Sequence, residues 1–477
     1  SSNKLRQRIL ASADTSLINM YKKWLSQKDY LSKIYSLTKT EVRKLGINAD
    51  SIEKATNDLE KKLSLKSELF KNTNDIQYYS WQDVQKELKD GEAAVELIRF
   101  QKYKFDSAGV YSDSIYYAAL IVKKSTKNCP ELILLKDGSD MELKYVHYYK
   151  NAIKFKSDDP FSYNMFWKPV HTALAGVKKI YFSPDGAYNQ ININSLKNPE
   201  TQAYVFDELE LQNVTNTKDL VLKRATKPSK KQIVLFGNPD YAMDEKTHHA
   251  NEIFSHLLNQ LPGTEEEVKK INKTMTQNNW FPKMFTGDDA TEKNIKNLNN
   301  PKVLHVATHG FFEKDMIVSN ENDQDKDKVK ENPLLRSGLM LAGASVALYN
   351  RNNAIFNVQK IEANYEDGIL TAYEAMNLNL DNTELVVLSA CETGQGEVKN
   401  GEGVYGLQRA FVIAGAKSII ISLWKVNDET TQKLMSAFYL EWIKTGNKAS
   451  AFRNAQLSLK KEFPEPYYWG AFVMVGE

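Results

Sequence analysis

Apolar residues recur at two different spacings along this chain, and the change of spacing divides it into regions. Within residues 1–75, apolar positions such as Leu17 and Tyr21 recur every three or four residues among charged ones, and the pattern returns between residues 52 and 63. This period is typical of amphipathic helices. We therefore expect two long helices, joined near Gly46 as an antiparallel hairpin.

Residues 76–227 contain short runs rich in β-branched and aromatic residues, bounded by turn residues. These runs are AAVELIRFQKY from Ala93, SIYYAALIVKK from Ser114, ELILLKD from Glu131 and KKIYFSPDG from Lys178. Helical patterns lie between them, which predicts a mixed α/β unit. The charged, proline-containing segment from Asn216 is expected to link this unit to the next.

Residues 228–477 alternate continuous Val/Ile/Leu runs with helical patterns. The apolar runs are IVLFGNP from Ile233, KVLHVATHG from Lys302, ELVVLSACETG from Glu384, SIIISLW from Ser418 and GAFVMVG from Gly470. This alternation predicts a mostly parallel sheet with helices on both faces. Functional residues of such sheets gather beyond the carboxyl ends of the strands, where His309 and Cys391 fall.

The charge balance, the cysteine count and the lengths of the apolar stretches disfavour several classes of protein. The 63 basic and 60 acidic residues nearly balance and are interspersed, which disfavours a direct nucleic-acid binder that works through a basic face. Two distant cysteines form no disulfide framework, so we expect a reducing, cytoplasmic setting. No secretory signal and no membrane span are expected, since the longest apolar stretch is interrupted by Arg409 and Lys417. Because the chain does not begin with Met, we expect a piece of a longer protein.

Cys391 and His309 are the candidate catalytic residues. The thiol directly follows a strand and precedes a glycine-rich loop, whose backbone can approach a substrate closely. The imidazole also follows a strand, where it can act as base and acid for a thiol, and the N–H of Gly310 beside it can donate to an oxyanion. Taken singly, each has a plainer interpretation: a buried inert cysteine, and a hydrogen-bonded loop histidine.

Neither a metal nor a cofactor is expected. His305 lies four residues before His309, but the flanking pattern is that of a strand, so a buried, hydrogen-bonded histidine is favoured over a zinc ligand. The glycine-rich loop after Cys391 lacks the spacing of a phosphate-binding loop, which disfavours a nucleotide-binding module.

Several blocks of this sequence resemble the CHAT domain family of caspase-like cysteine peptidases, from the clan that also holds separases, gingipains and metacaspases. The blocks are HVATHGFF, NPLLRSGLMLAG, DGILTAYEAMNLNLDNTELVVLSACETGQGE, GEGVYGLQRAFVIAGAKSIIISLWKVNDETT and PYYWGAFVMVG. A weaker similarity extends back through residues 76–227. The resemblance implies a caspase-like fold preceded by a second, pseudo-caspase-like α/β unit.

The resemblance also implies roles for individual residues. Cys391 would be the nucleophile that forms a thioester, and His309 would shuttle the proton. The backbone N–H groups of Gly310 and Cys391 would bind the oxyanion. By similarity to separases, Asp428 would bind a basic residue before the scissile bond; its alternative interpretation is a helix N-cap. Glu392 is a second, weaker candidate for substrate binding.

The expected partners are a protein substrate and an activating or regulatory protein. Family members often carry tetratricopeptide repeats, and this chain shows none of that period. The polar insertion at residues 321–332 is expected to be an exposed loop that is mobile or cleavable. The leading hypothesis is a gated cysteine endopeptidase; the alternative is a catalytically silent caspase-like scaffold.

Overall fold

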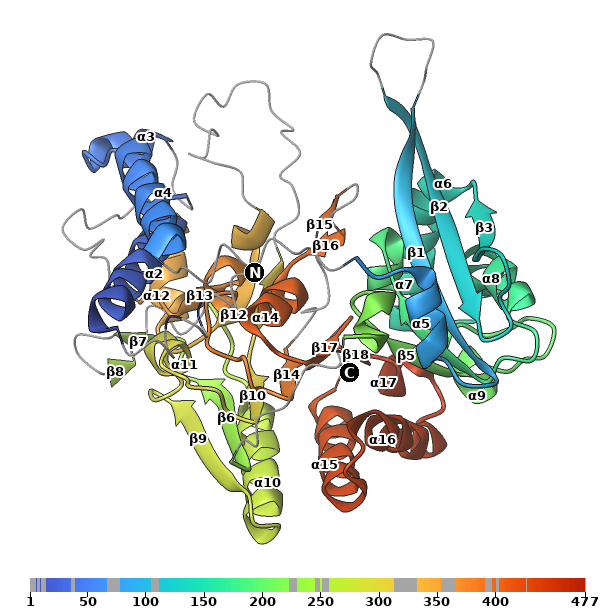
Figure 1. The fold of residues 1–477 in the computed structure, drawn as a ribbon. Coiled ribbons are helices and arrows are strands. Elements are labelled where there is room, and N and C mark those ends of the chain that lie inside the picture. Colours follow the sequence, from blue (N-terminus) through green and yellow to red (C-terminus); the bar gives the residue numbers. More distant parts are fainter. Residues whose placement is uncertain are drawn as a thin grey trace.

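The computed structural model describes residues 6, 9, 14–35, 39–66, 78–103, 111–222, 230–244, 249–250, 257–312, 333–352, 366–390, 397–399, 403–425 and 427–476. Within these ranges an 11-stranded sheet runs through the molecule (Figure 1). Its strands, in spatial order, are β3 (Glu131–Leu135), β2 (Tyr111–Lys123), β1 (Glu92–Tyr103), β4 (Lys179–Ser183), β5 (Glu210–Asn213), β18 (Phe472–Gly476), β17 (Ser418–Ser422), β14 (Leu385–Ser389), β10 (Val303–Ala307), β6 (Gln232–Pro239) and β9 (Phe281–Gly287).

The sheet is mostly parallel, and helices cover both of its faces. Only β1–β2, β2–β3 and β17–β18 pair antiparallel among these strands. One face of the carboxyl-terminal half packs against α10 (Pro262–Gln277), α15 (Asp428–Thr445) and α16 (Lys448–Glu462). The other face packs against α11 (Glu292–Lys296), α13 (Ala372–Ala375) and α14 (Leu407–Ala414). This confirms the expected fold class.

Successive residues of the central strands point to opposite faces, which explains their uninterrupted apolar runs. Val303 and Val387 belong to the core that includes α10 and α15, whereas Leu304 and Val386 belong to the core that includes α14. A strand buried on both sides has no polar face to display.

The amino-terminal half of the sheet has its own core. The long strands β1 and β2 pack against α7 (Val146–Phe155) and α8 (Lys168–Ala173), around the buried side chains of Trp167, Tyr117 and Phe182. The remaining α-helices of this half are α5 (Trp81–Glu87), α6 (Gly138–Asp140) and α9 (Val205–Glu208). Helix α17 (Pro466–Trp469), which belongs to the other half, contacts α7.

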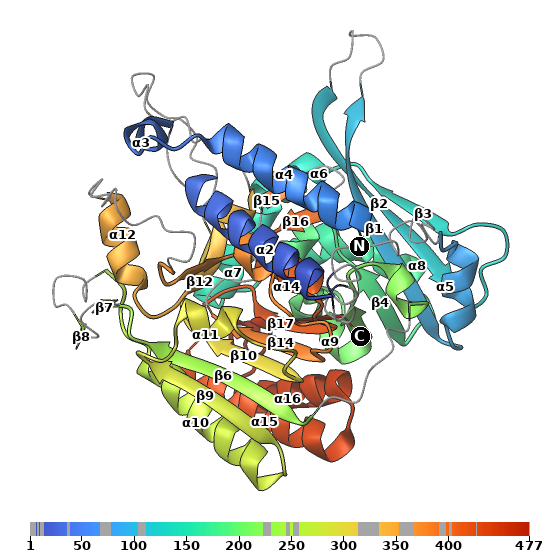
Figure 2. The same ribbon diagram turned by 60° about the vertical axis from the view of Figure 1, so that its left-hand side comes forward.

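Helices occupy the described part of the amino-terminal region. α2 (Thr15–Tyr35) and α4 (Ala49–Lys66) lie side by side in both views, with α3 (Lys39–Lys44) between them in sequence (Figures 1 and 2). Leu17, Trp24 and Leu63 share a small core. Polar contacts tie this region to the body: Arg6 pairs with Asp381.

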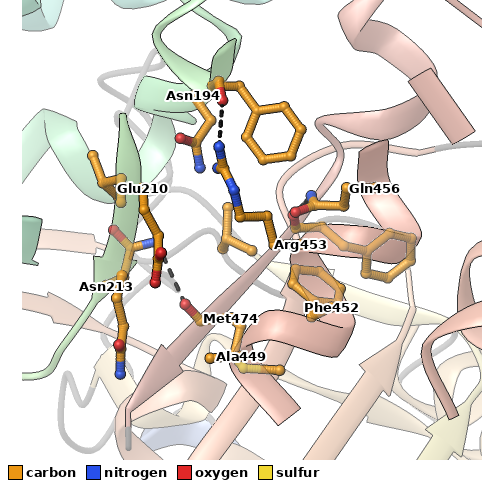
Figure 3. A pocket seen from close by; sticks show the side chains of 13 residues that line it. Asn194, Glu210, Asn213, Ala449, Phe452, Arg453, Gln456 and Met474 are labelled. Carbon is orange, nitrogen blue, oxygen red and sulfur yellow. Dashed lines mark hydrogen bonds between the residues drawn. The ribbon is translucent and has the colours of Figure 1, made fainter. Parts of the chain in front are cut away.

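The two halves of the sheet meet where β5 lies beside β18. One backbone pair, Val475 with Asn213, joins these strands, and side-chain amides reach across. The Gln212 amide donates to the carbonyl of Gly476 at 3.2 Å. Figure 3 shows a pocket at this junction, where the Arg453 guanidinium donates to the Phe206 carbonyl at 2.7 Å.

Some elements differ from the sequence expectation. Strand β9 and helix α16 had not been predicted, nor had a small sheet of β11 (Gly310–Phe312), β12 (Ser337–Met340) and β13 (Ile369–Thr371). The other described strands and α-helices are β7 (Met243–Asp244), β8 (His249–Ala250), α12 (Ala344–Asn352), β15 (Glu397–Lys399) and β16 (Gly403–Tyr405). Short π- and 3-10 helices are η2 (Met141–Tyr145), η3 (Tyr163–Trp167), η4 (Gly186–Gln190), η5 (Ile193–Ser195), η6 (Thr217–Leu220) and η7 (Pro333–Leu335).

Two of the expected connecting segments fall wholly or partly outside the described residues. The insertion at 321–332 is one, and residues 223–229 of the expected linker are the other. The unit boundaries at 75/76 and 227/228 remain predictions. Among the described helices, none combines the length and the apolar character that crossing a bilayer requires.

Candidate active site

Two neighbouring central strands carry the candidate site at their carboxyl ends. β10 and β14 are parallel and in register, with Ala307 opposite Ser389. His309 follows Ala307 by two residues, and in the sequence Cys391 follows Ser389 by two residues. Cys391 and Glu392 lie outside the described residues, so their side chains have no structural account.

His309 is held by its ring and by its backbone. Nε2 lies 2.8 Å from the backbone carbonyl of Asn259, which can only accept a hydrogen bond. Nε2 therefore carries the proton in the neutral imidazole, and Nδ1 is left as the acceptor. The ring packs against Tyr241, with centroids 5.2 Å apart, and the His309 N–H donates to the Tyr241 hydroxyl at 3.3 Å.

The surroundings favour the neutral form of this imidazole. Burial lowers the pKa of His309 below its ordinary value, and the positive charge of Lys425 lowers it further. The hydrogen bond to Asn259 opposes the shift. Lys425 lies in the segment after β17, so β17 contributes to the electrostatics of the same strand ends.

Gly310 and Asp428 have defined positions near this edge. Gly310 is the first residue of β11 and pairs with Leu339 of β12. Asp428 is exposed in the first turn of α15, and its carboxylate lies so close to Gly263 that a Cβ there would approach Oδ2 to 2.3 Å. The N-cap of α15 is Asn427, which accepts from the N–H of Glu429 at 2.7 Å, so the interpretation of Asp428 as the N-cap is wrong by one residue.

His305 is buried and hydrogen-bonded, as the strand pattern predicted. Its Nε2 lies 2.9 Å from Glu267 and its Nδ1 lies 3.1 Å from the Tyr439 hydroxyl. Across the described ranges, no group of three or more His, Cys, Asp or Glu side chains is arranged to hold a metal ion.

Comparison with known families gives this architecture a name. The CHAT domain profile matches residues 163–477, which is more than half of the chain. The chain belongs to the CHAT domain family. This confirms the resemblance seen in the sequence blocks, and the match includes both strands of the candidate site.

Curated relatives of this CHAT chain include tetratricopeptide repeat protein 28 of Mus musculus, 33% identical over 224 residues. The Homo sapiens protein of the same name is 24% identical over 236 residues. Each alignment covers 46% of this chain and 9% of the relative, so the chain corresponds to a small part of those proteins.

Solved structures similar to this CHAT chain include a cysteine proteinase and a separase–securin complex. The Arg-specific cysteine proteinase gingipain R matches with a TM-score of 0.40 and 9% identity, over 72% of this chain and 75% of that one. The separase–securin complex of Saccharomyces cerevisiae matches with a TM-score of 0.35 and 10% identity, over 72% and 19%.

Three residues around His309 in this CHAT domain had not been predicted from the sequence. They are Tyr241, Asn259 and Lys425. Tyr241 follows strand β6 within two residues, so its place beyond a strand end was a usable signal. Asn259 acts through its backbone carbonyl, which every residue type possesses, so no side-chain pattern could reveal it.

Proposed function

We propose that this CHAT domain is a cysteine endopeptidase in which Cys391 is the nucleophile and His309 the general base and acid. One observation carries the proposal. Strands β10 and β14 pair in register, and His309 and Cys391 each come two residues after a pair of opposite residues in these strands. Neighbouring strands lie about 4.8 Å apart, a spacing that side chains beyond their ends can bridge.

The contacts of His309 support a specific proton path. Nε2–H is committed to the Asn259 carbonyl, so Nδ1 takes the proton of the Cys391 thiol. The thiolate sulfur attacks the substrate carbonyl carbon, and the backbone N–H groups of Gly310 and Cys391 donate to the oxyanion. His309 returns the proton to the leaving amine, a thioester remains, and water hydrolyses it with His309 again acting as base.

Asp428 is proposed to bind a Lys or Arg side chain before the scissile bond. It is exposed and lies against Gly263. Gly263 is four residues from Asn259, so Asp428 lies against the segment whose Asn259 carbonyl holds His309. A carboxylate at such an edge forms charge-assisted hydrogen bonds with a basic side chain. Glu392 is a further substrate contact in this proposal, and a partner protein is proposed to gate the site.

The test uses a peptide library incubated with wild-type protein, Cys391→Ala and His309→Ala, with products read by mass spectrometry. We expect wild type alone to yield cleavage products, cut after Lys or Arg. Asp428→Asn should lose that preference while still cleaving, because it removes the charge and keeps the shape. Identical products from wild type and both dyad variants would contradict the proposal and favour the non-catalytic scaffold.

A further inference from the structure

A single buried carboxylate connects the two strands that end at the candidate site. Glu267 lies on α10, beneath the sheet, and its Oε1 is 2.9 Å from Nε2 of His305 in β10. Its Oε2 accepts a hydrogen bond from the Ser389 hydroxyl of β14 at 3.1 Å. Glu267 is 3% exposed and His305 is fully buried. Glu267, His305 and Ser389 are called the carboxylate bridge below.

The hydrogen bonds of the carboxylate bridge have one consistent set of donors. Burial raises the pKa of Tyr439 well above its ordinary value, and the charge of Glu267 adds to the rise, so the phenol keeps its proton. Because a carboxylate only accepts, Nε2–H of His305 donates to Glu267, and in the neutral imidazole Nδ1 is left to accept from the Tyr439 hydroxyl at 3.1 Å. A buried carboxylate that loses one of its own donors, His305 or Ser389, is strongly destabilising, so both contacts of Glu267 contribute to the stability of the folded protein.

The carboxylate bridge sits a short distance along the chain from both candidate catalytic residues. His305 precedes His309 by four residues, and Ser389 precedes Cys391 by two. A second tie lies next to it, where the Ser422 hydroxyl of β17 donates to the carbonyl of Ala390. The peptide that leads into Cys391 is therefore anchored from two neighbouring elements.

We propose that Glu267 is a positioning residue that holds the ends of β10 and β14 so that Nδ1 of His309 and the sulfur of Cys391 stay within reach. This inference rests on the proposed function. Glu267 is too buried to touch a substrate, so its effect is transmitted through His305 and Ser389. Displacement of a reacting group by about 1 Å can cost about a hundredfold in rate.

The experiment measures the pH dependence of Cys391 alkylation by iodoacetamide, together with kcat and KM on a cleaved library peptide. All variants carry Cys129→Ser, because Cys129 is a free, exposed thiol that would also react. Ser389→Ala cuts the bridge from β14. Tyr439→Phe is the matched control, since it removes a buried hydrogen bond from His305 but leaves both contacts of Glu267. Glu267→Gln keeps an acceptor for His305 and gains a donor for Ser389.

We expect Ser389→Ala to move the alkylation midpoint upward, toward the free-thiol value of about 8.5, because the thiol loses the imidazole that accepts its proton. Its kcat should fall roughly tenfold with KM unchanged. Glu267→Ala should behave likewise, whereas Glu267→Gln and Tyr439→Phe should keep the wild-type midpoint.

Two outcomes separate the possible failures. If His309→Ala shifts the alkylation midpoint but Ser389→Ala does not, or Tyr439→Phe shifts it equally, the positioning role of Glu267 is overturned and the dyad stands. If His309→Ala leaves the midpoint unchanged, the dyad itself fails, and the positioning role fails with it.

Discussion

His309 shows how individual contacts suit a side chain to the proton transfer that we propose for it. The Asn259 carbonyl fixes which nitrogen carries the hydrogen, and the Tyr241 ring and hydroxyl fix the orientation of the imidazole and its backbone. The sequence made His309 a candidate because it follows an apolar strand and precedes glycine. It could not identify Asn259, because a backbone carbonyl leaves no mark in the residue type.

Replacing Lys425 tests the electrostatics at this scale. The charge of Lys425 disfavours the imidazolium, so Lys425→Met is expected to raise the pKa of His309 toward the ordinary value of about 6.5. The acidic limb of the activity profile should move to higher pH with it. The pKa is measured by NMR titration of the His309 ring protons. Lys461→Met, which changes another surface lysine, is the control, and an unchanged pKa in Lys425→Met would contradict the prediction.

Among the elements, α2 is attached to the sheet-bearing body by a partly buried charge cluster. The ammonium of Lys296 in α11 lies 2.9 Å from Asp29 of α2 and 3.2 Å from Glu374 of α13. It also pairs with Glu292 and Glu366, at 2.6 and 2.8 Å. Burial alone would lower the pKa of Lys296, but these carboxylates outweigh it and raise the pKa, so the charge is retained.

Removing this ammonium should make the stability strongly pH-dependent. Burial already raises the pKa values of Glu292 and Glu374 in the folded protein. A carboxyl group with a raised folded pKa contributes stability below its unfolded value, near 4.5, and loses it as pH rises through the folded pKa. Lys296→Met should raise both pKa values further.

The free energy of unfolding of Lys296→Met should therefore fall more steeply between pH 5 and 8 than that of wild type, with a loss of about 3–5 kcal/mol at neutral pH. Urea unfolding at several pH values measures this. Lys168→Met, which removes the exposed pair with Glu200, should match wild type. A flat pH dependence in Lys296→Met would count against the cluster as the attachment of α2.

Helices and strands whose apolar residues recur at a clear spacing were predictable from the sequence, and those without such a spacing were not. The long helices of residues 1–75 and the apolar central strands follow directly from spacing. Strand β9 was missed because it forms an edge of the sheet and reads FPKMFTG, in which Phe281 is 68% exposed and Lys283 interrupts the apolar positions. Helix α16 was missed because Ser, Asn and Lys occupy many of its positions.

Across the whole molecule, the two halves share one sheet, and Phe206 of the amino-terminal half is buried in the core of the other half. Phe206 belongs to α9 of the amino-terminal half, yet it is buried with α15 and α16 and stacks on Trp469 at 5.1 Å. The guanidinium carbon of Arg453 lies 4.4 Å from the centroid of the Phe206 ring. The pairing of β5 with β18 joins segments more than 250 residues apart, which no local pattern in the sequence could indicate.

The shared sheet and the burial of Phe206 in the other half predict cooperative unfolding of both halves. Phe206→Ala should lower the free energy of unfolding by about 3–5 kcal/mol through the cavity it leaves. In differential scanning calorimetry the transition should move to lower temperature and remain single. Phe161→Ala, at a half-exposed ring, is the control and should change little. Two separate transitions in the wild-type protein would show that the halves unfold independently.

The central placement of β10 and β14 limits how the proposed gating of this protein could work. β10 is paired with β6 and β14, and β14 with β10 and β17, so each strand is fastened along both of its edges. Sliding either one would break backbone hydrogen bonds on two sides at once. Under the proposed gating, a partner protein would therefore act on the segments that follow these strands and not on the strands themselves.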